Sequence, residues 1–190
     1  MLIHLEYLNP LERFLNEILI PRNTLVVLCG PAGSGKSTWA SKHFLSSQIV
    51  SSDECRALIV DDPADQSVSA QAFDLFHYII EQRLMLGRLT VADATNLKLE
   101  HRRNLLRIAN RNRFNTAAIL FDVPTDICVE RNSTRKRRVP QEALFMQREM
   151  FETTLYSIRK EKFDYVHVLD QESQSNVAVR IGRYLSRRSR

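Results

Sequence analysis

The segment GPAGSGKST has the residue types and the spacing of a phosphate-binding loop. It occupies residues 30–38 and fits the pattern G-x-x-x-x-G-K-[ST]. Glycines in this pattern let backbone N–H groups curl around phosphate oxygens, and the helix that follows adds its positive dipole end. Lys36 would reach the β- and γ-phosphates, and the Ser37 hydroxyl is placed to ligate Mg²⁺. The nucleotide-binding residues that the pattern predicts are Gly30, Pro31, Ala32, Gly33, Ser34, Gly35, Lys36, Ser37 and Thr38. We therefore expect a site for ATP with Mg²⁺.

A carboxylate and a guanidinium three residues apart form a second candidate group. Asp53 and Arg56 lie in the segment SSDECR, after a short strand pattern. On a helix, side chains at i and i+3 are neighbours, so both can point toward one cleft. In a phosphoryl-transfer site such a carboxylate can accept a hydroxyl proton, and the arginine can hold a phosphate of the acceptor. The structural alternative is an N-capping aspartate with a surface ion pair.

Two further features have residue types suited to phosphate chemistry. Asp93 directly follows the apolar segment 89–92 and resembles a Walker B acid, which holds Mg²⁺ through water. An aspartate in a plain turn is the alternative. The other feature is a basic run ahead of a helix pattern, and such a run is often only a solvated face. Its members are Arg131, Arg135, Lys136, Arg137 and Arg138.

The elements that must position these residues alternate between strand and helix patterns. Strands are expected over residues 24–29, 48–51, 89–92, 116–123 and 165–169. Helices are expected over residues 10–20, 39–45, 54–60, 69–87, 99–112 and 140–162, from 124 and from 176 onward. This alternation indicates an α/β fold with a parallel sheet that is buried on both faces. In such a sheet ligands bind at the carboxyl ends of the strands, where Gly30, Asp53 and Asp93 are expected.

Composition narrows the class of protein. A chain of 190 residues predicts one domain over residues 1–190, and the formal charge of +5 favours an anionic partner, although ATP is itself one. Three cysteines far apart in the sequence, Cys29, Cys55 and Cys128, favour a reducing compartment over a disulfide framework. No apolar run approaches about 18 residues, and no signal-peptide pattern opens the chain. We therefore expect a cytoplasmic protein without a membrane partner.

Several segments together carry a resemblance to a known family. These are SSDECR and residues 61–66, 72–79 and 83–96, and the likeness extends over about residues 24–169. They resemble the kinase domain of bacterial polynucleotide kinase-phosphatase, an RNA end-healing enzyme. The resemblance implies an ATP-dependent polynucleotide 5′-hydroxyl kinase with a P-loop kinase fold. That fold has a parallel central sheet flanked by helices and a small arginine-rich lid, here at about residues 131–140.

The resemblance also implies roles for individual residues. Lys36 and Ser37 would serve ATP and Mg²⁺, Asp53 would be the general base, and Arg56 would hold the phosphate of the acceptor nucleotide. Gln66 matches a residue near the transferred phosphate. The lid residues that the resemblance implies are Arg131, Arg135 and Arg138, with Arg138 joining Lys36 in stabilising the transferring group.

The sequence departs from that family in three respects. Pro140 directly follows the lid arginines, and the expected helix over residues 10–20 lies outside the likeness. The multi-enzyme relatives also continue into phosphatase and ligase modules. This sequence has no metallophosphatase-like clusters of histidine and aspartate and no K-x-D-G motif, so we expect separately encoded proteins to supply those activities.

Two other functions fit the same motifs. One is a P-loop kinase of a small metabolite, nucleoside or antibiotic, and the other is a non-catalytic ATP-binding module, which would not need Asp53. Charge favours a nucleic-acid acceptor, for which the resemblance implies a 5′-OH end, because basic residues beyond those that ATP needs gather in three places. These are the segment 131–138, the tail 180–190 and one helix with Arg102, Arg103, Arg107 and Arg111. RNA and DNA are not distinguished by these features.

Overall fold

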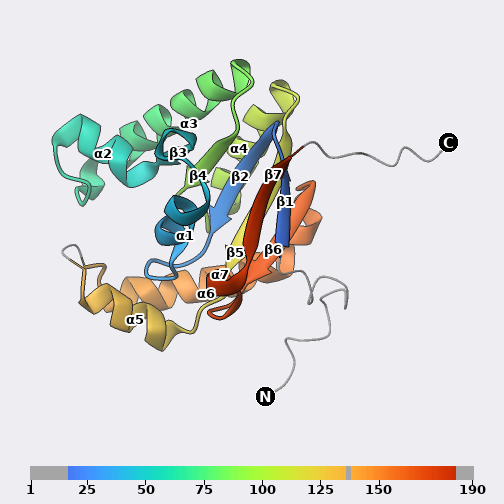
Figure 1. The fold of residues 1–190 in the computed structure, drawn as a ribbon. Coiled ribbons are helices and arrows are strands. Elements are labelled where there is room, and N and C mark those ends of the chain that lie inside the picture. Colours follow the sequence, from blue (N-terminus) through green and yellow to red (C-terminus); the bar gives the residue numbers. More distant parts are fainter. Residues whose placement is uncertain (1–16, 136–137, 183–190) are drawn as a thin grey trace.

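The core of the structure is a parallel sheet of five strands in the order β3-β4-β2-β5-β6 (Figure 1). The computed structural model describes residues 17–135 and 138–182. The strands are β2 (Thr24–Cys29), β3 (Ile49–Ser51), β4 (Thr90–Asp93), β5 (Asn115–Phe121) and β6 (Tyr165–Leu169). Every residue of β2 is buried, because β4 and β5 flank it and other elements cover both faces of the sheet. The expected α/β fold with a parallel sheet is therefore confirmed.

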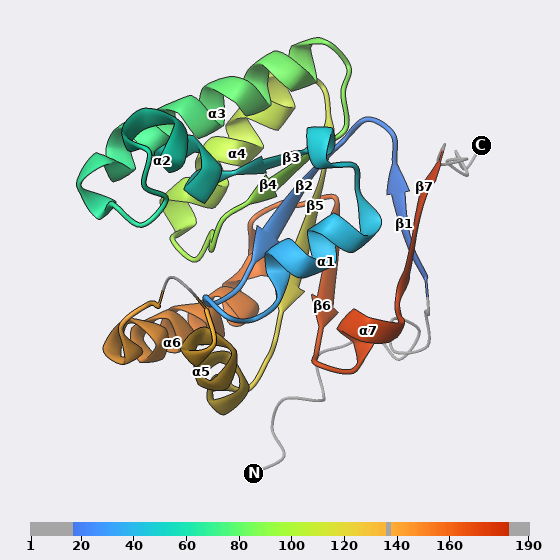
Figure 2. The same cartoon turned by 60° about the vertical axis from the view of Figure 1, so that its left-hand side comes forward.

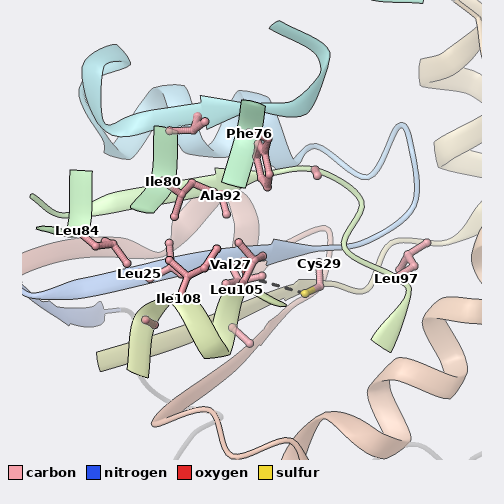
Figure 3. Close-up of a cluster of buried hydrophobic side chains, with 14 of the residues drawn as sticks. Leu25, Val27, Cys29, Phe76, Ile80, Leu84, Ala92, Leu97, Leu105 and Ile108 are labelled. Atoms are coloured by element: carbon pink, nitrogen blue, oxygen red, sulfur yellow. Dashed lines mark hydrogen bonds between the residues drawn. The ribbon is translucent and has the colours of Figure 1, made fainter. Parts of the chain in front are cut away.

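Long helices cover one face of this sheet. They are α2 (Ser52–Val60), α3 (Ser69–Met85), α4 (Leu99–Arg111) and α6 (Gln141–Ser157). Alternate residues of β2, namely Leu25, Val27 and Cys29, point to this side because side chains alternate along a strand. Figure 3 shows them against apolar residues of α3 and α4. The same helices leave their other sides free to build a site at the carboxyl edge of the sheet.

The opposite face is covered by α1 (Lys36–His43) and by a second, two-stranded sheet (Figures 1 and 2). In that sheet β1 (Glu17–Pro21) pairs in parallel with β7 (Ala178–Gly182). Ile18 and Ile20 of β1 pack with Val26 and Leu28 of β2 in a second buried cluster. A strand pair therefore occupies part of a layer in which the sequence predicts only helices.

Two expected helices are wrong where the structure describes them. Residues 17–20 of the expected helix 10–20 lie in β1, and residues 10–16 lie outside the described residues. The helix expected from 176 onward is the short α7 (Ser173–Asn176), which ends where β7 follows; residues 183–190 are also outside. In β7 the apolar Val179 and Ile181 flank Arg180, which suits a strand with one buried side. In β1 the residues Ile18, Leu19 and Ile20 form a short apolar run, which fits a strand as well as a helix. The pairing of segments this distant leaves no local signal.

The remaining elements are short or connect the sheet to the site. A helix α5 (Thr125–Ser133) follows β5, and the chain then passes through the arginine-rich segment to α6. Three 3-10 turns are η2 (Ser46–Gln48), η3 (Gln66–Val68) and η4 (Ile158–Lys160). In the described part of the chain no helix has the length and apolar character that a bilayer crossing requires.

Candidate active site

The loop between β2 and α1 has the backbone geometry of a phosphate-binding loop. Gly33 and Gly35 have φ values of 83° and 96°, in the left-handed region that favours glycine. A Cβ atom on Gly33 would lie 2.5 Å from the carbonyl oxygen of Cys128 in α5, so this glycine also allows close packing. The amide of Trp39 donates to the carbonyl of Gly35 at 2.9 Å, and α1 begins at Lys36, within the segment 30–38. The N-terminal amides of α1 therefore face the loop, as an anion site requires.

Lys36 folds back over this loop. Its Nζ donates to the carbonyl oxygens of Gly30 at 2.8 Å and of Pro31 at 2.6 Å. Burial lowers the pKa of Lys36 to about 8, although the charge of Asp93 acts in the opposite direction. A bound phosphate would offer this ammonium charged acceptors in place of neutral carbonyls, so nucleotide binding would stabilise its charged form.

Asp93 ends β4, and its side chain and that of Ser37 line the same cleft. Burial raises the pKa of Asp93, whereas Ser37 and Lys36 lower it. No cluster of three or more His, Cys, Asp or Glu side chains suited to a metal occurs among the described residues. A hydroxyl and one carboxylate nevertheless fit Mg²⁺, which takes oxygen ligands and fills most of its positions with water and substrate phosphates. A buried carboxylate in a site that raises its pKa also gains from a cation.

Asp53 and Arg56 are held by the first turn of α2. The N-cap of this helix is Ser51, whose hydroxyl accepts from the amide of Glu54 at 3.3 Å, so Asp53 is not the cap. The Asp53 side chain is 56% exposed, and its Oδ1 accepts from Nη1 of Arg56 at 2.7 Å. Arg56 is 4% exposed and also donates to the carbonyl of Pro63 at 3.0 Å. Its Nε is buried without a hydrogen-bond partner among the described residues. A surface ion pair does not describe this geometry.

A single cleft of about 1010 Å³ brings most of the expected residues together. It lies where the carboxyl ends of β3 and β4 meet the phosphate-binding loop, as expected for a parallel sheet. The expected site residues on its wall are Ala32, Gly33, Gly35, Lys36, Ser37, Asp53, Arg56, Gln66, Asp93, Arg135 and Arg138.

Five expected residues are not on that wall, namely Gly30, Pro31, Ser34, Thr38 and Arg131. Arg131 instead donates to the carbonyl of Gly33 at 3.5 Å. Lys136 and Arg137 of the expected lid lie outside the described residues.

A family described as "AAA domain" matches residues 25–154, which is more than half of the chain. The chain belongs to this AAA-domain family. The match contains the phosphate-binding loop, Asp53, Asp93 and the lid segment, whereas β1 and β7 lie outside it.

One curated relative of this AAA-domain protein is the L-seryl-tRNA(Sec) kinase of Methanococcus maripaludis. The two sequences are 27% identical over 169 residues, which cover 80% of this chain and 66% of that enzyme. The chain therefore spans slightly less than two thirds of the relative's length.

Solved structures of similar fold include RNA-repair and sugar-kinase proteins. A chain of the Pnkp1/Rnl/Hen1 RNA repair complex matches with a TM-score of 0.61 and 22% identity, over 76% of this chain and 47% of that one. A gluconokinase from Sinorhizobium meliloti 1021 matches with a TM-score of 0.52 and 18% identity, over 83% and 89%. The AAA-domain protein thus has the P-loop kinase fold that the resemblance implies.

The structure adds to the AAA-domain site two glutamines that no sequence pattern indicates. Gln147 of α6 lines the cleft, and its Oε1 accepts from the amide of Ala32 at 2.8 Å. Gln174 of α7 lies against the loop, since a Cβ atom on Gly35 would come within 2.6 Å of its Oε1. Both contacts join residues that are far apart in sequence, so spacing gives no sign of them.

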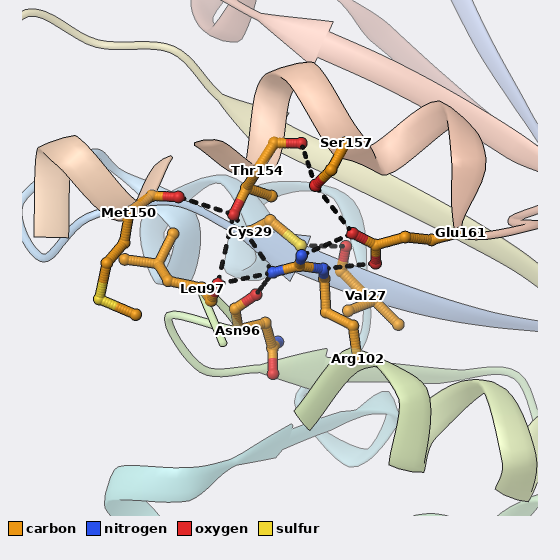
Figure 4. Close-up of polar contacts among 9 residues, drawn as sticks. All are labelled: Val27, Cys29, Asn96, Leu97, Arg102, Met150, Thr154, Ser157 and Glu161. Atoms are coloured by element: carbon orange, nitrogen blue, oxygen red, sulfur yellow. Dashed lines mark hydrogen bonds and ion pairs between the residues drawn. The ribbon is translucent and has the colours of Figure 1, made fainter. Parts of the chain in front are cut away.

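One expected phosphate contact of the AAA-domain protein is wrong. Arg102 of α4 is 2% exposed and forms a two-point ion pair with Glu161, at 2.7 Å from Nε and 2.6 Å from Nη2 (Figure 4). Its Nη1 donates to the carbonyls of Asn96 and Leu97 at 2.8 and 2.7 Å. The guanidinium therefore has all its partners within the protein, where it connects the loop before α4 to the segment after α6.

Other cations from the expected nucleic-acid surface also have partners. Arg111 pairs with Glu81 at 3.1 Å, and Arg180 pairs with Glu17 at 3.1 Å. Arg107 donates to the side-chain oxygen of Asn104 at 2.6 Å. These contacts weaken the argument that total positive charge indicates a nucleic-acid partner. The cations that could bind acceptor phosphates are then those that line the cleft.

Proposed function

We propose that this chain is an ATP-dependent phosphotransferase whose acceptor is the 5′-hydroxyl end of a polynucleotide. One observation carries the proposal: a single cleft holds a phosphate-binding loop on one side and the Asp53–Arg56 pair on the other. The loop accounts for ATP, and an exposed carboxylate facing the same cleft accounts for an acceptor hydroxyl.

The nucleotide would lie along the loop and the start of α1. The amides of the loop and the ammonium of Lys36 would surround the β- and γ-phosphates. Ser37 and Asp93 would hold Mg²⁺, which neutralises charge on the phosphates when it is bound. Binding of the γ-phosphate would break the hydrogen bond from Ala32 to Gln147, so that the backbone amide of Ala32 could donate to a phosphate oxygen.

Transfer requires an in-line approach of the acceptor oxygen to the γ-phosphorus. Asp53 would orient the 5′-hydroxyl and take its proton while the new O–P bond forms and the bond to the bridging oxygen of ADP breaks. Arg56 already fixes the direction of that carboxylate through the 2.7 Å contact. Its buried Nε has no partner among the described residues and would gain one from a phosphate of the acceptor.

The lid would supply positive charge from the other side of the cleft. Arg135 and Arg138 both line it, and the charge of Arg135 acts on both Lys36 and Asp93. Arg138, with Lys36, would stabilise the charge that spreads over the transferring group, and such arginine contacts supply about 10³-fold or more. Gln66 lines the same cleft at the start of η3 and would lie near the transferred phosphate.

Two relatives support a nucleic-acid acceptor, because one is named for an RNA repair complex and the other for a kinase of a charged tRNA. The gluconokinase neighbour supports a small-molecule acceptor on the same fold.

Radiolabelled ATP tests the proposal directly. The protein should transfer label to a single-stranded 5′-OH oligonucleotide much faster than to a nucleoside, gluconate or a serylated tRNA. Faster transfer to any of those three would replace the polynucleotide acceptor, and no transfer to any acceptor would contradict phosphotransferase activity.

A further inference from the structure

Three aromatic side chains are in contact on the wall of the cleft that α3 and α4 form. Phe73 and His77 lie one helical turn apart on α3, His101 lies in the first turn of α4, and all three line the cleft. The Phe73 ring centroid is 4.6 Å from that of His101 and 6.0 Å from that of His77. The ring planes meet at 43° and 41°, so the rings are tilted against one another. We call Phe73, His77 and His101 the ring wall.

The two histidines of the ring wall are suited to a neutral ligand. Burial lowers the pKa of both His77 and His101, with Lys98 and Arg102 lowering that of His101 further. The nearby carboxylates of Asp74 and Glu100 raise these pKa values but act more weakly than burial. A neutral imidazole has one donor and one acceptor nitrogen, which suits the edge of a heterocycle better than a phosphate.

One polar atom of the ring wall lacks a partner. His77 Nε2 is buried and has no hydrogen-bond partner among the described residues. A buried polar atom without a partner is costly, and a ligand in the cleft that supplies one removes that cost. The ring wall therefore offers aromatic faces together with an unused hydrogen-bonding position.

We infer that the ring wall is the stacking platform for the terminal nucleobase of the acceptor. This inference rests on the proposed function, because it places a nucleotide beside Asp53 and Arg56 in the same cleft. Aromatic faces stack every base, so the platform would select nucleic-acid ends over sugars while tolerating any terminal base. Specificity for the class of acceptor would then come from α3 and α4, and the chemistry from the loop and α2.

The test compares two oligonucleotides and two variants. One oligonucleotide is single-stranded with a 5′-OH purine nucleotide, and the other is identical except that its terminal residue is abasic. Phe73→Leu removes the ring but keeps an apolar side chain for the core cluster that Phe73 contacts. Tyr78→Leu is the matched control, since Tyr78 is an exposed aromatic residue of the same helix that does not line the cleft. His77→Leu serves as a second variant should Phe73→Leu fold poorly.

For the normal oligonucleotide we expect Phe73→Leu to raise KM by about fivefold to a hundredfold, with kcat nearly unchanged. For the abasic one, wild type and Phe73→Leu should have the same KM, and Tyr78→Leu should match wild type throughout. A 2-aminopurine base at the 5′ end gives a readout without turnover, because stacking quenches its fluorescence. Wild type should quench it in the presence of a non-hydrolysable ATP analogue, and Phe73→Leu should not.

Each contrary result has one meaning. Equal KM values of wild type for the two oligonucleotides, or an equal effect of Phe73→Leu on both, would overturn the platform. Quenching by wild type without phosphate transfer would support the platform and overturn the proposed activity. Neither quenching nor transfer would overturn both.

Discussion

Asp53 and Arg56 have opposite surroundings although only two residues separate them. The carboxylate faces the cleft and is largely exposed, whereas the guanidinium is buried beneath it and bonded to Pro63. The exposed carboxylate can thus be reached from the cleft, and the buried guanidinium holds it in one direction. Under the proposed function, Asp53 would take the proton of the acceptor hydroxyl and Arg56 would position the carboxylate.

Asp53→Asn tests the first of these roles. We expect kcat to fall by about 10²–10⁴-fold, since the amide cannot take the hydroxyl proton. The dissociation constant of ATP should stay within about threefold, because the carboxylate faces the acceptor side. Glu54→Gln is the matched control, as Glu54 is an exposed carboxylate of the same helical turn that does not line the cleft. An Asp53→Asn protein with more than about a tenth of the wild-type rate would remove the base assignment.

Asp93 gives a prediction about stability and pH. Its pKa is raised by burial, so the ionised carboxylate costs free energy in the folded, ligand-free protein at neutral pH. We therefore expect Asp93→Asn to raise the thermal midpoint at pH 7 without nucleotide. This gain should shrink as the pH falls toward the unfolded value of 3.8, where the wild-type carboxyl group is protonated as well. A lower thermal midpoint of Asp93→Asn at pH 7 would contradict the argument that burial makes the ionised carboxylate costly. The same variant should also lose magnesium-dependent phosphate transfer.

At the scale of elements, Arg102 connects three parts of the chain. It holds the carbonyls of Asn96 and Leu97 before α4, and it pairs with Glu161 after α6 (Figure 4). The loop that contains Asn96 directly follows Asp93, and its neighbours Ala94 and Thr95 line the cleft. The buried ion pair therefore fixes one edge of the site through the backbone.

Arg102→Met should lower the free energy of unfolding by about 3–5 kcal/mol, because it leaves Glu161 charged and buried without its partner. The double variant Arg102→Met with Glu161→Met should lose less than the two single changes combined. Urea unfolding followed by circular dichroism measures both. Arg107→Met, an exposed arginine of the same helix, should change stability by no more than about 0.5 kcal/mol. Additive losses would show that the two side chains act independently.

The lid gives a second prediction at this scale. Arg138→Ala should lower kcat more than it weakens ATP binding, because charge on the transferring group is largest in the transition state. Arg131→Ala should instead weaken ATP binding, since Arg131 contacts the loop at Gly33 and does not line the cleft. Steady-state kinetics and nucleotide titration separate the two effects. Unchanged constants in both variants would mean that the cluster is only a solvated face.

The sequence predicts local features of this fold well. The loop at residues 30–38 and the five strands of the main sheet depend on short patterns, and the structure contains all of them. The sequence predicts poorly the features that depend on contacts between residues far apart in the chain. Neither the pairing of β1 with β7 nor the burial of Arg102 beside Glu161 has a local pattern, and Gln147 reaches Ala32 only through the tertiary fold.

At the scale of the whole molecule, net charge overstates the surface available to a nucleic acid. Several arginines outside the cleft pair with carboxylates, so among the described arginines we expect Arg56, Arg135 and Arg138, which line the cleft, to be the ones that meet acceptor phosphates. The logarithm of acceptor affinity should then fall with the logarithm of salt at a slope of about −1 to −2, given about −0.7 for each phosphate contacted on a single strand. Steady-state KM for the oligonucleotide over a range of potassium chloride measures this slope. A slope steeper than about −4 would indicate an extended basic surface.

The pairing of β1 with β7 has a consequence for how the chain is made. A ribosome releases β1 early and β7 only after every other described strand, so β1 waits without its partner through most of elongation. During that time Ile18 and Ile20 already belong to an apolar strand with an open edge, the kind of segment that nascent chains expose to chaperones or to one another. The main sheet can form while the chain is still being synthesised. Its second face is fully covered only after β7, the last described strand, has been synthesised.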